Sequence, residues 1–519
     1  MTRALILMCL LGGCTELPPP PVSAVPPPID DIDADLGAEN SDAHRPIQVR
    51  NDLGPSVRDA AVDAMGQDAD RSSLDGSSSS DGTPPFDANT MPMDGRVDGS
   101  EQPDATIEII DGPARYPAGQ IHSPITAHTR AVMAEIAAVE GTQDDQVFMK
   151  IGASSTVSRS TLHCFAGDTV DLGDAQDLQM TLDYFLGGDA GGDTPFDRVT
   201  LAARVGHSAG WATAGDPSPI DNEIAAIDPR LAIVHYGTND MALVGAYRDG
   251  LIHFYGRMML LIEELVARGI VPILTGITRR GDNARANLWV HTFNAAIRGM
   301  AQKWQVPFID LHLAVDTLNR HGLSGDGLHL NGYPRGACLL TEEGLEYGYN
   351  VRNLIVLTAL DRVRRTLFTD QAPLDPPLAP LPGNGTSESP YEIETLPFSD
   401  SRDTTQSGHS RFDEYGCDDA DESGPEYVYR FQTAREIRLR AVVLDRDGVD
   451  IDLHLLGEDG LAEGCLDRGH HEMAFTLAPG TYHFVLDSWV DGDGDAQSGA
   501  YLFLLVECDE GDDACAGAP

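Results

Sequence analysis

Between about residues 106 and 370 the chain alternates short apolar runs with longer amphipathic stretches, and this alternation limits the possible folds more than any other feature. The apolar runs have the length of buried strands and lie at Val147–Ile151, Val199–Val205, Leu231–Tyr236, Ile270–Ile277 and Val306–Leu311. The clearest helical stretches are Tyr247–Arg268, Arg285–Trp304 and Tyr349–Leu367. Strands joined through helices form a parallel sheet that is covered on both faces. We therefore predict one α/β domain over 106–370, with ligands at the carboxyl ends of its strands.

The chain beyond this domain follows another pattern. Residues 371–390 are rich in Pro and predict a linker. From 391 to 519, short alternating segments are separated by Gly and Asp turns, which predicts an antiparallel β-sandwich with an acidic tail. The segments "ESGPEYVYRF", "VDIDLHLL" and "APGTYHFVLDSW" resemble bacterial pre-peptidase C-terminal-like domains, which accompany secreted enzymes.

The first thirteen residues predict a signal peptide. Arg3 precedes the apolar run "ALILMCLL", which is too short to span a bilayer. The run ends in Leu-Gly-Gly followed by Cys14, and this ending resembles a bacterial lipobox. The resemblance implies that Cys14 is lipidated, becomes the mature N-terminus and anchors the protein to a membrane; Thr15 after it suggests the outer membrane. The alternative is an ordinary signal peptide with an incidental cysteine.

Residues 14–105 consist mainly of Pro, Asp, Ser and Gly, with almost no aromatic residues. Such a segment cannot bury enough apolar surface to offset the entropy of ordering it. We therefore predict a disordered tether between the anchor and the α/β domain.

The charge of the chain excludes some partners. It contains 82 acidic and 35 basic residues, which gives a net charge of −47 at pH 7. Nucleic acid and anionic lipid surfaces both require clustered Lys and Arg. We therefore predict no nucleic-acid partner and no electrostatic attachment to a membrane.

Two serine motifs compete for the role of nucleophile. The first is "GHSAG", residues 206–210, which matches the G-x-S-x-G nucleophile elbow with Ser208 at its centre. An elbow needs a helix directly after its serine, and the continuation "WATAGDPSPIDNE" makes a long helix improbable. A short motif of this kind also arises easily by chance.

The second motif is "KIGASST", in which Ser154 follows the first predicted strand. Three further blocks support it. "AGWAT" places Gly210 after the second strand, "HYGTND" places Asn239 after the third, and "SGDGLHLNG" places Asp326 three residues before His329. With that spacing one loop can present a histidine base together with the carboxylate that orients it.

The four blocks, in this order, resemble the SGNH (GDSL) hydrolase family. The resemblance implies a flavodoxin-like three-layer α/β/α sandwich and ester hydrolysis without a cofactor or metal. It implies that Ser154 is the nucleophile and that Asp326 and His329 complete the triad. The oxyanion donors it implies are the N–H groups of Ser154 and Gly210 and the side-chain amide of Asn239.

One residue departs from the family pattern. The first block usually reads Gly-Asp-Ser, whereas this chain has Ala153 before the serine. The missing carboxylate is not the triad acid, so acyl transfer remains possible. Gly206 is an alternative to Gly210 for the second block, because "RVGHSAGWAT" can be aligned in either way.

The sequence thus predicts an exported, lipid-anchored serine esterase. Its substrate is an acetylated glycan, a short-chain ester or a lysophospholipid. Two alternatives stay open: a non-catalytic surface binding protein, and an α/β-hydrolase that uses Ser208. The oligomeric state is not determined by any of these features.

The cysteines suggest three disulfides that would fit an exported protein. Cys164 and Cys338 would clamp both sides of the active site, the alternative being two unpaired buried cysteines. Cys417 and Cys465 would bridge the two sheets of the β domain, and Cys508 with Cys515 would close the acidic tail. The acidic loop "DGDGDAQSG", with Asp491, Asp493 and Asp495, lacks the Gly and Glu of an EF-hand and favours a hairpin turn over a calcium site. His470 and His471 have no metal-ligand spacing and are predicted to lie at the surface.

Overall fold

The computed structural model describes residues 112–369 and 373–519. The predicted signal peptide, Cys14 and the tether lie outside the described residues. Within them, no helix is both long and apolar enough to cross a membrane.

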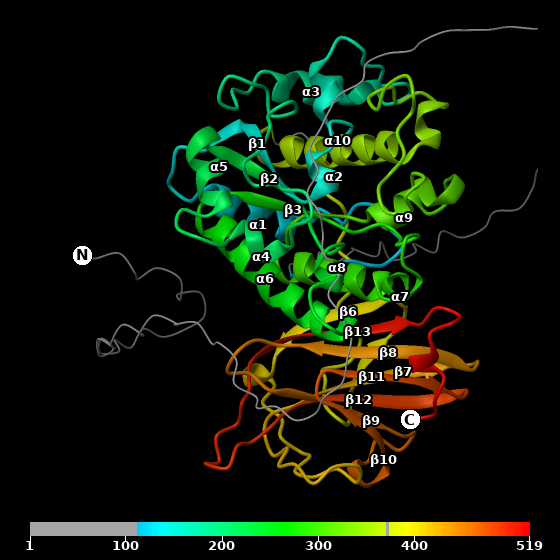
Figure 1. Ribbon diagram of the computed structural model, residues 1–519. Helices are drawn as coiled ribbons and strands as arrows, with labels where there is room; N and C mark the ends of the chain where they lie inside the picture. The colour runs from blue at the N-terminus through cyan, green and yellow to red at the C-terminus, as the bar shows by residue number, and fades with distance from the viewer. Residues whose placement is uncertain (1–111, 370–372) are drawn as a thin grey trace, which may run out of the picture. The chain divides into compact units, whose positions relative to one another are not determined.

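The α/β domain contains the predicted parallel sheet (Figure 1). Its strands pair in the order β1-β2-β3-β4, and they are Asp144–Gly152 (β1), Pro229–His235 (β2), Val271–Thr275 (β3) and Phe308–Ile309 (β4). In the centre of the sheet, Ile233 of β2 lies between Lys150 of β1 and Ile273 of β3. Every residue of β2 is buried, because helices cover both faces of the sheet.

The prediction of a buried strand at Val199–Val205 is wrong. This segment forms a single parallel bridge, in which Ala203 lies beside Gly152 at the end of β1. Val199 and Val205 are more than half exposed, at 68% and 61%. Because no other part of the described chain buries these side chains, they do not stabilise an extended strand, and the segment pairs with β1 at one residue only. Its place on the free side of β1 still matches the strand order expected for a flavodoxin-like sheet.

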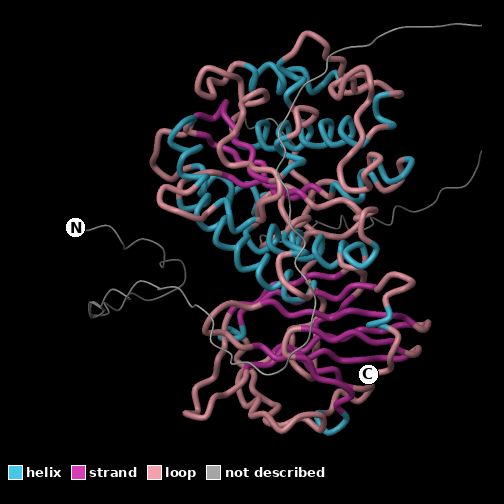
Figure 2. Tube along the Cα trace, viewed as in Figure 1, coloured by secondary structure: helices cyan, strands magenta, loops and turns pink. Residues whose placement is uncertain are grey.

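Helices lie on both faces of the sheet, which confirms the predicted three-layer α/β/α sandwich (Figure 2). Helices α4, α5, α6 and α8 cover one face, whereas α1, α3 and α10 cover the other. The helices are α1 (Ala127–Ala137), α2 (Ser154–Val157), α3 (Gln179–Leu186), α4 (Ala209–Ala212), α5 (Pro219–Ile227), α6 (Tyr247–Ala267), α7 (Ala284–Asn287), α8 (Val290–Trp304), α9 (Leu311–Val315) and α10 (Gly348–Leu367).

The C-terminal region contains the predicted all-β domain, formed by two sheets. One has the strand order β10-β9-β12-β7-β5 and the other β11-β8-β13-β6. The pairing is antiparallel except between β5 and β7. The strands are Tyr391–Ile393 (β5), Phe398–Asp403 (β6), Tyr427–Thr433 (β7), Ile437–Leu444 (β8), Ile451–Leu456 (β9), Cys465–Gly469 (β10), Glu472–Leu477 (β11), Gly480–Ser488 (β12) and Ala500–Glu507 (β13). The sequence did not predict β5, β6 or β10, which are short or polar.

Strand β13 is apolar on both of its faces because the two domains share a core. Its residues Tyr501 and Phe503 point into the β domain, whereas Leu502 and Leu504 belong to the core of the α/β domain. Helix α8 packs against β6 and β13. Gly299 of α8 permits this contact, since a Cβ there would lie 2.6 Å from a methyl group of Leu502.

All three suggested disulfides are confirmed: Cys164–Cys338, Cys417–Cys465 and Cys508–Cys515. The prediction that Cys417–Cys465 bridges the two sheets is wrong, because Cys417 lies in a turn and only Cys465 belongs to a strand. The acidic loop is a turn, as favoured. Its Asp491 side chain accepts hydrogen bonds from the backbone N–H groups of Asp493 and Asp495, each at 3.0 Å.

Candidate active site

The nucleophile candidate Ser154 lies where β1 ends and a one-turn helix, α2, begins. Gly152 makes this sharp turn possible, because a Cβ there would lie 2.2 Å from the Thr156 hydroxyl and 2.7 Å from the carbonyl oxygen of His235. Ala153 occupies the N-cap position and supplies no side-chain cap. As the first residue of a helix, Ser154 has a backbone N–H without an intrahelical acceptor.

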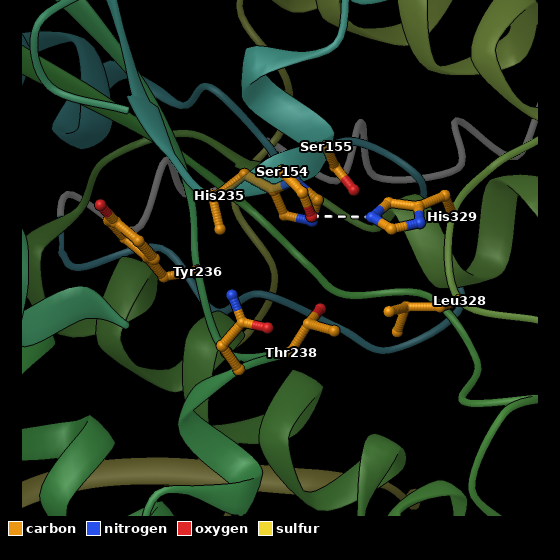
Figure 3. A pocket seen from close by; sticks show the side chains of 10 residues that line it. Ser154, Ser155, His235, Tyr236, Thr238, Leu328 and His329 are labelled. Atoms are coloured by element: carbon orange, nitrogen blue, oxygen red, sulfur yellow. Dashed lines mark hydrogen bonds between the residues drawn. The ribbon is translucent and has the colours of Figure 1, made fainter. Parts of the chain in front are cut away.

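The structure brings Ser154, His329 and Asp326 together. The Ser154 Oγ lies 2.8 Å from Nε2 of His329, and Nδ1 of the same ring lies 2.7 Å from a carboxylate oxygen of Asp326. The carboxylate can only accept, so Nδ1 carries a proton and Nε2 is free to accept from the serine hydroxyl. Figure 3 shows this contact, with the His329 ring directed at Ser154.

The Asp326 carboxylate is held ionised by its surroundings. Its Oδ1 accepts from the Ser324 hydroxyl at 2.6 Å and from the backbone N–H groups of Leu328 and His329, each at 3.0 Å. Partial burial raises the pKa of this group, but these hydrogen bonds together with that from the His329 ring outweigh it and hold the pKa well below its usual range. Asp326 therefore stays negatively charged beside His329.

Asn239 lies at the end of β2 and lines the same pocket as Ser154 and His329. Its Nδ2 donates to the backbone carbonyl of His207 at 2.9 Å. This bond uses one of the two amide hydrogens, so the second remains available to a ligand in the pocket. Asn239 occupies the N-cap position of the short helix Asp240–Ala242, but its side chain makes no cap bond there.

Asp240 connects two loops of the site. Its carboxylate accepts from the backbone N–H groups of Ala209, at 2.9 Å, and Gly237, at 3.0 Å. Burial raises the pKa of Asp240 to about 6, although these two bonds favour its ionised form. The loop after β2 is thereby tied to the turn that contains Ser208.

Gly210 and Ser208 line a neighbouring depression rather than the pocket at Ser154. Gly206, the alternative second-block glycine, is exposed and has a positive φ of 76°. It does not line the Ser154 pocket either. Neither glycine of the second block is thus among the residues that line the Ser154 pocket, and the role of Gly210 as an oxyanion donor stays a prediction.

Three buried polar residues support the site, and the sequence analysis missed them. Arg352 of α10 donates to the carbonyl of Ser155 at 2.9 Å, and the Thr161 hydroxyl donates to the same oxygen at 2.6 Å. Asn353 donates to the carbonyl of Ser160, behind the nucleophile turn, and to that of Ala337, behind the His329 loop. In the sequence, only the polar residues Arg352 and Asn353 on the buried face of the last helix could have indicated such support.

The walls of the Ser154 pocket contain no group of side chains with metal-ligand geometry. Such groups among residues 112–369 and 373–519 all lie in the β domain, and two of them contain disulfide cysteines. The third contains His470, whose ring lies 3.1 Å from carboxylates of Asp450 and Asp452. Hydrogen bonds to these carboxylates raise the pKa of His470 to about 10.

Comparison with known proteins agrees with this geometry. Residues 187–333 match the model of the GDSL-like Lipase/Acylhydrolase family. This part of the α/β domain is therefore similar to GDSL-like acylhydrolases. The matched segment includes Asn239, Asp326 and His329 but begins after Ser154. The place of Ser154 in the site therefore rests on its contact with His329 in the structure. No curated protein matches the chain significantly.

Solved structures resemble both parts of the chain. A GDSL-like lipase from Bacteroides thetaiotaomicron is 16% identical and matches 45% of this chain and 98% of its own, with a TM-score of 0.27. An acetylxylan esterase from Geobacillus stearothermophilus is 12% identical over 43% of this chain and 96% of its own (TM-score 0.28). The pre-peptidase C-terminal domain of a Bacillus anthracis collagenase is 19% identical over 22% of this chain and 91% of its own (TM-score 0.16). At such low sequence identity and TM-score, these similarities do not assign a role to any residue of this chain.

Proposed function

We propose that the GDSL-like domain is a serine esterase that works through an acyl-enzyme, with Ser154 as nucleophile, His329 as base and Asp326 as the residue that orients the base. The observation that carries this proposal is the continuous chain of hydrogen bonds from the Ser154 hydroxyl through His329 to Asp326. A serine hydroxyl becomes a competent nucleophile when such a base accepts its proton.

The proton moves along this chain in each half of the reaction. Ser154 Oγ attacks the ester carbonyl carbon while its proton passes to Nε2 of His329, and Asp326 stabilises the imidazolium. When the tetrahedral intermediate collapses, the C–O bond of the ester breaks and His329 protonates the departing alcohol. Water then attacks the acyl-enzyme, His329 takes its proton, and Ser154 is released together with a carboxylic acid.

The negative oxygen of the intermediate needs donors that are already oriented. The backbone N–H at the start of α2 and the second amide hydrogen of Asn239 are suited to this role. The bond from Asn239 to His207 fixes the plane of the amide before substrate binds. Gly210, which lines the neighbouring depression, stays the third predicted donor.

The test is hydrolysis of p-nitrophenyl acetate by the full chain, with fluorophosphonate labelling and peptide mapping. We expect turnover, and a label on the peptide that contains Ser154. Absence of both in the wild type would favour the alternative of a non-catalytic binding protein, for which Ala153 at the nucleophile turn is the supporting observation. Extension of the assay to acetylated glycans, short-chain esters and lysophospholipids would identify the substrate.

We also propose that the protein is exported and anchored through lipid on Cys14, in the outer membrane or at the cell surface. The support is the sequence alone, from Arg3 to Thr15. Acyl chains attached to Cys14 would hold the protein on the membrane. We expect Cys14→Ser to move the protein from the membrane fraction to the soluble fraction. Retention of this variant in the membrane after signal cleavage would contradict the proposal.

A further inference from the structure

A second depression lies next to the Ser154 pocket and is not used by the reaction described above. Helix α6 forms one of its walls with His253 and Arg257. These residues are four positions apart and therefore lie on the same side of the helix. Ser208, Gly210 and Leu243 line the rest of the depression.

Arg257 is supported by the backbone of the opposite wall. A Cβ on Gly210 would lie 3.2 Å from Cδ and 3.4 Å from Nε of Arg257, so the stem of the arginine rests on the glycine. A side chain at position 210 would crowd this arginine. This contact with Gly210 uses none of the hydrogen-bond donors of the Arg257 guanidinium group.

Neither Arg257 nor His253 makes a hydrogen bond or an ion pair with another residue of the described chain. Both side chains are exposed to solvent. Some arginines of the same domain are paired with carboxylates, for example Arg198 with Glu223 at 3.1 Å and Arg279 with Asp316 at 2.6 Å. The carboxylate that lines the depression, that of Asp240, is buried and already accepts from two backbone N–H groups. The cationic side chain therefore has its donors free.

The depression adjoins the reactive pocket through one short chain of contacts. The carbonyl of His207, next to Ser208, accepts from Asn239, and Asn239 lines the Ser154 pocket. A substrate with its ester at Ser154 could extend past Asn239 and reach α6. Guanidinium groups bind carboxylates and phosphates through paired, charge-assisted hydrogen bonds.

We propose that Arg257, assisted by His253, binds an anionic group, a carboxylate or a phosphate, carried by the ester substrate. This inference rests on the proposed esterase function and narrows its substrate class to anionic esters, such as acetylated acidic sugars or esters of phosphate-bearing alcohols. Arg257 contributes to substrate affinity and takes no part in proton transfer.

The experiment compares matched neutral and anionic esters with the full chain. One pair is an acetylated hexuronic acid glycoside and its methyl ester, and the other is acetylated glycerol phosphate and acetylated glycerol. We expect wild type to favour the anionic member of at least one pair by about 10-fold in kcat/KM, mainly through KM. The pair that shows the preference distinguishes carboxylate from phosphate. The preference should decrease in high salt, because the group that is bound is exposed to solvent.

Arg257→Gln should bring the ratio of anionic to neutral kcat/KM close to one, and Arg257→Lys should retain part of the preference. The matched control is Arg438→Gln, which removes the same charge from an exposed position of the β domain. It should leave the ratio and the activity as in wild type.

A wild type that hydrolyses neutral esters without preferring anionic ones would overturn this inference and leave the esterase function intact. The same holds if Arg257→Gln keeps the wild-type ratio. A wild type that hydrolyses no ester of either pair, and takes no fluorophosphonate label, would instead refute the proposed function, and this inference with it.

Discussion

The two serine-containing turns of the α/β domain differ in what surrounds the hydroxyl. Ser154 follows the regular strand β1, and its hydroxyl contacts His329. Ser208 follows an irregular segment and caps the one-turn helix α4 without a side-chain cap bond. Within residues 112–369 and 373–519, no side chain accepts the proton of Ser208. The Nδ1 atom of the adjacent His207 lies 3.0 Å from the carbonyl oxygen of Val205.

This difference shows why a motif is weaker evidence than a position at the edge of a sheet. "GHSAG" has the letters of a nucleophile elbow but lacks the strand before it and the long helix after it. "KIGASST" has few distinctive letters but lies at the carboxyl end of β1, where loops from β2 and from the end of the domain also arrive. The position brings a base to Ser154.

The largest expected loss of kcat follows from removal of the nucleophile or of its base. Ser154→Ala and His329→Ala should each lower kcat by about 10⁶-fold, and the double variant should lose little more, because the members of a triad act as a unit. Steady-state kinetics with p-nitrophenyl acetate would measure this. Ser155→Ala is the matched control on the same turn and should keep most of the activity. If Ser155→Ala, rather than Ser154→Ala, abolished turnover, the assignment would be reversed.

A smaller effect is expected from the candidate oxyanion donor. Asn239→Ala should lower kcat by about 10²–10³-fold with a modest change in KM, because the lost hydrogen bond forms mainly in the transition state. Asn222→Ala on α5, which removes the same amide from a site away from the pocket, is the control. An unchanged kcat in Asn239→Ala would mean that this residue only holds the His207 loop.

The environment of Asp326 can be tested through the dependence of stability on pH. The hydrogen bond from Ser324 helps to depress the pKa of Asp326, so Ser324→Ala should raise it. A depressed carboxyl pKa stabilises the fold above the unfolded value, near pH 4, and this contribution is lost as pH falls toward the folded pKa. The stability deficit of Ser324→Ala should therefore be complete at neutral pH and shrink below about pH 4.

Denaturant titrations at a series of pH values would measure this deficit. Ser324→Thr keeps the hydroxyl group and should behave as wild type. A deficit that is the same at all pH values would show that the hydroxyl of Ser324 does not act through the charge of Asp326.

The smallest effect is expected at the other turn. Ser208→Ala should change the kcat for p-nitrophenyl acetate by no more than a few-fold, since its hydroxyl contacts no base. Fluorophosphonate labelling of the variant should still occur at Ser154. A label on the peptide with Ser208 in wild type, and none on Ser154, would make the GHSAG motif the true nucleophile.

Much of the fold was predictable because its signals are local. The periodicity of apolar residues marked β1, β2, β3 and the long helices α6, α8 and α10 to within a few residues. The three disulfides were also suggested from the positions of the cysteines. Val199–Val205 failed because its apolar residues resemble a strand locally, whereas burial, which would stabilise one, depends on layers supplied by distant parts of the chain.

The candidate site was predictable only in part. Ser154, Asn239, Asp326 and His329 follow strand ends or lie on a terminal loop, and the order of their blocks along the chain was informative. Arg352 and Asn353 could not be assigned, because they act on carbonyl groups close to 200 residues away in sequence. Such contacts depend on how α10 packs against the sheet, and no local pattern encodes that.

The sequence by itself determined which residue types stand at the strand ends, since strand periodicity and turn chemistry are local properties of the chain. Only the tertiary structure decided which of the two serines meets a base, because that depends on where the loop of residues 324–329 is held. It also decided that β13 is covered on both faces, since Leu502 and Leu504 are buried by α8 rather than by their own domain. The physical reason is the same in both cases: burial and hydrogen bonding between distant segments form only when the chain has packed.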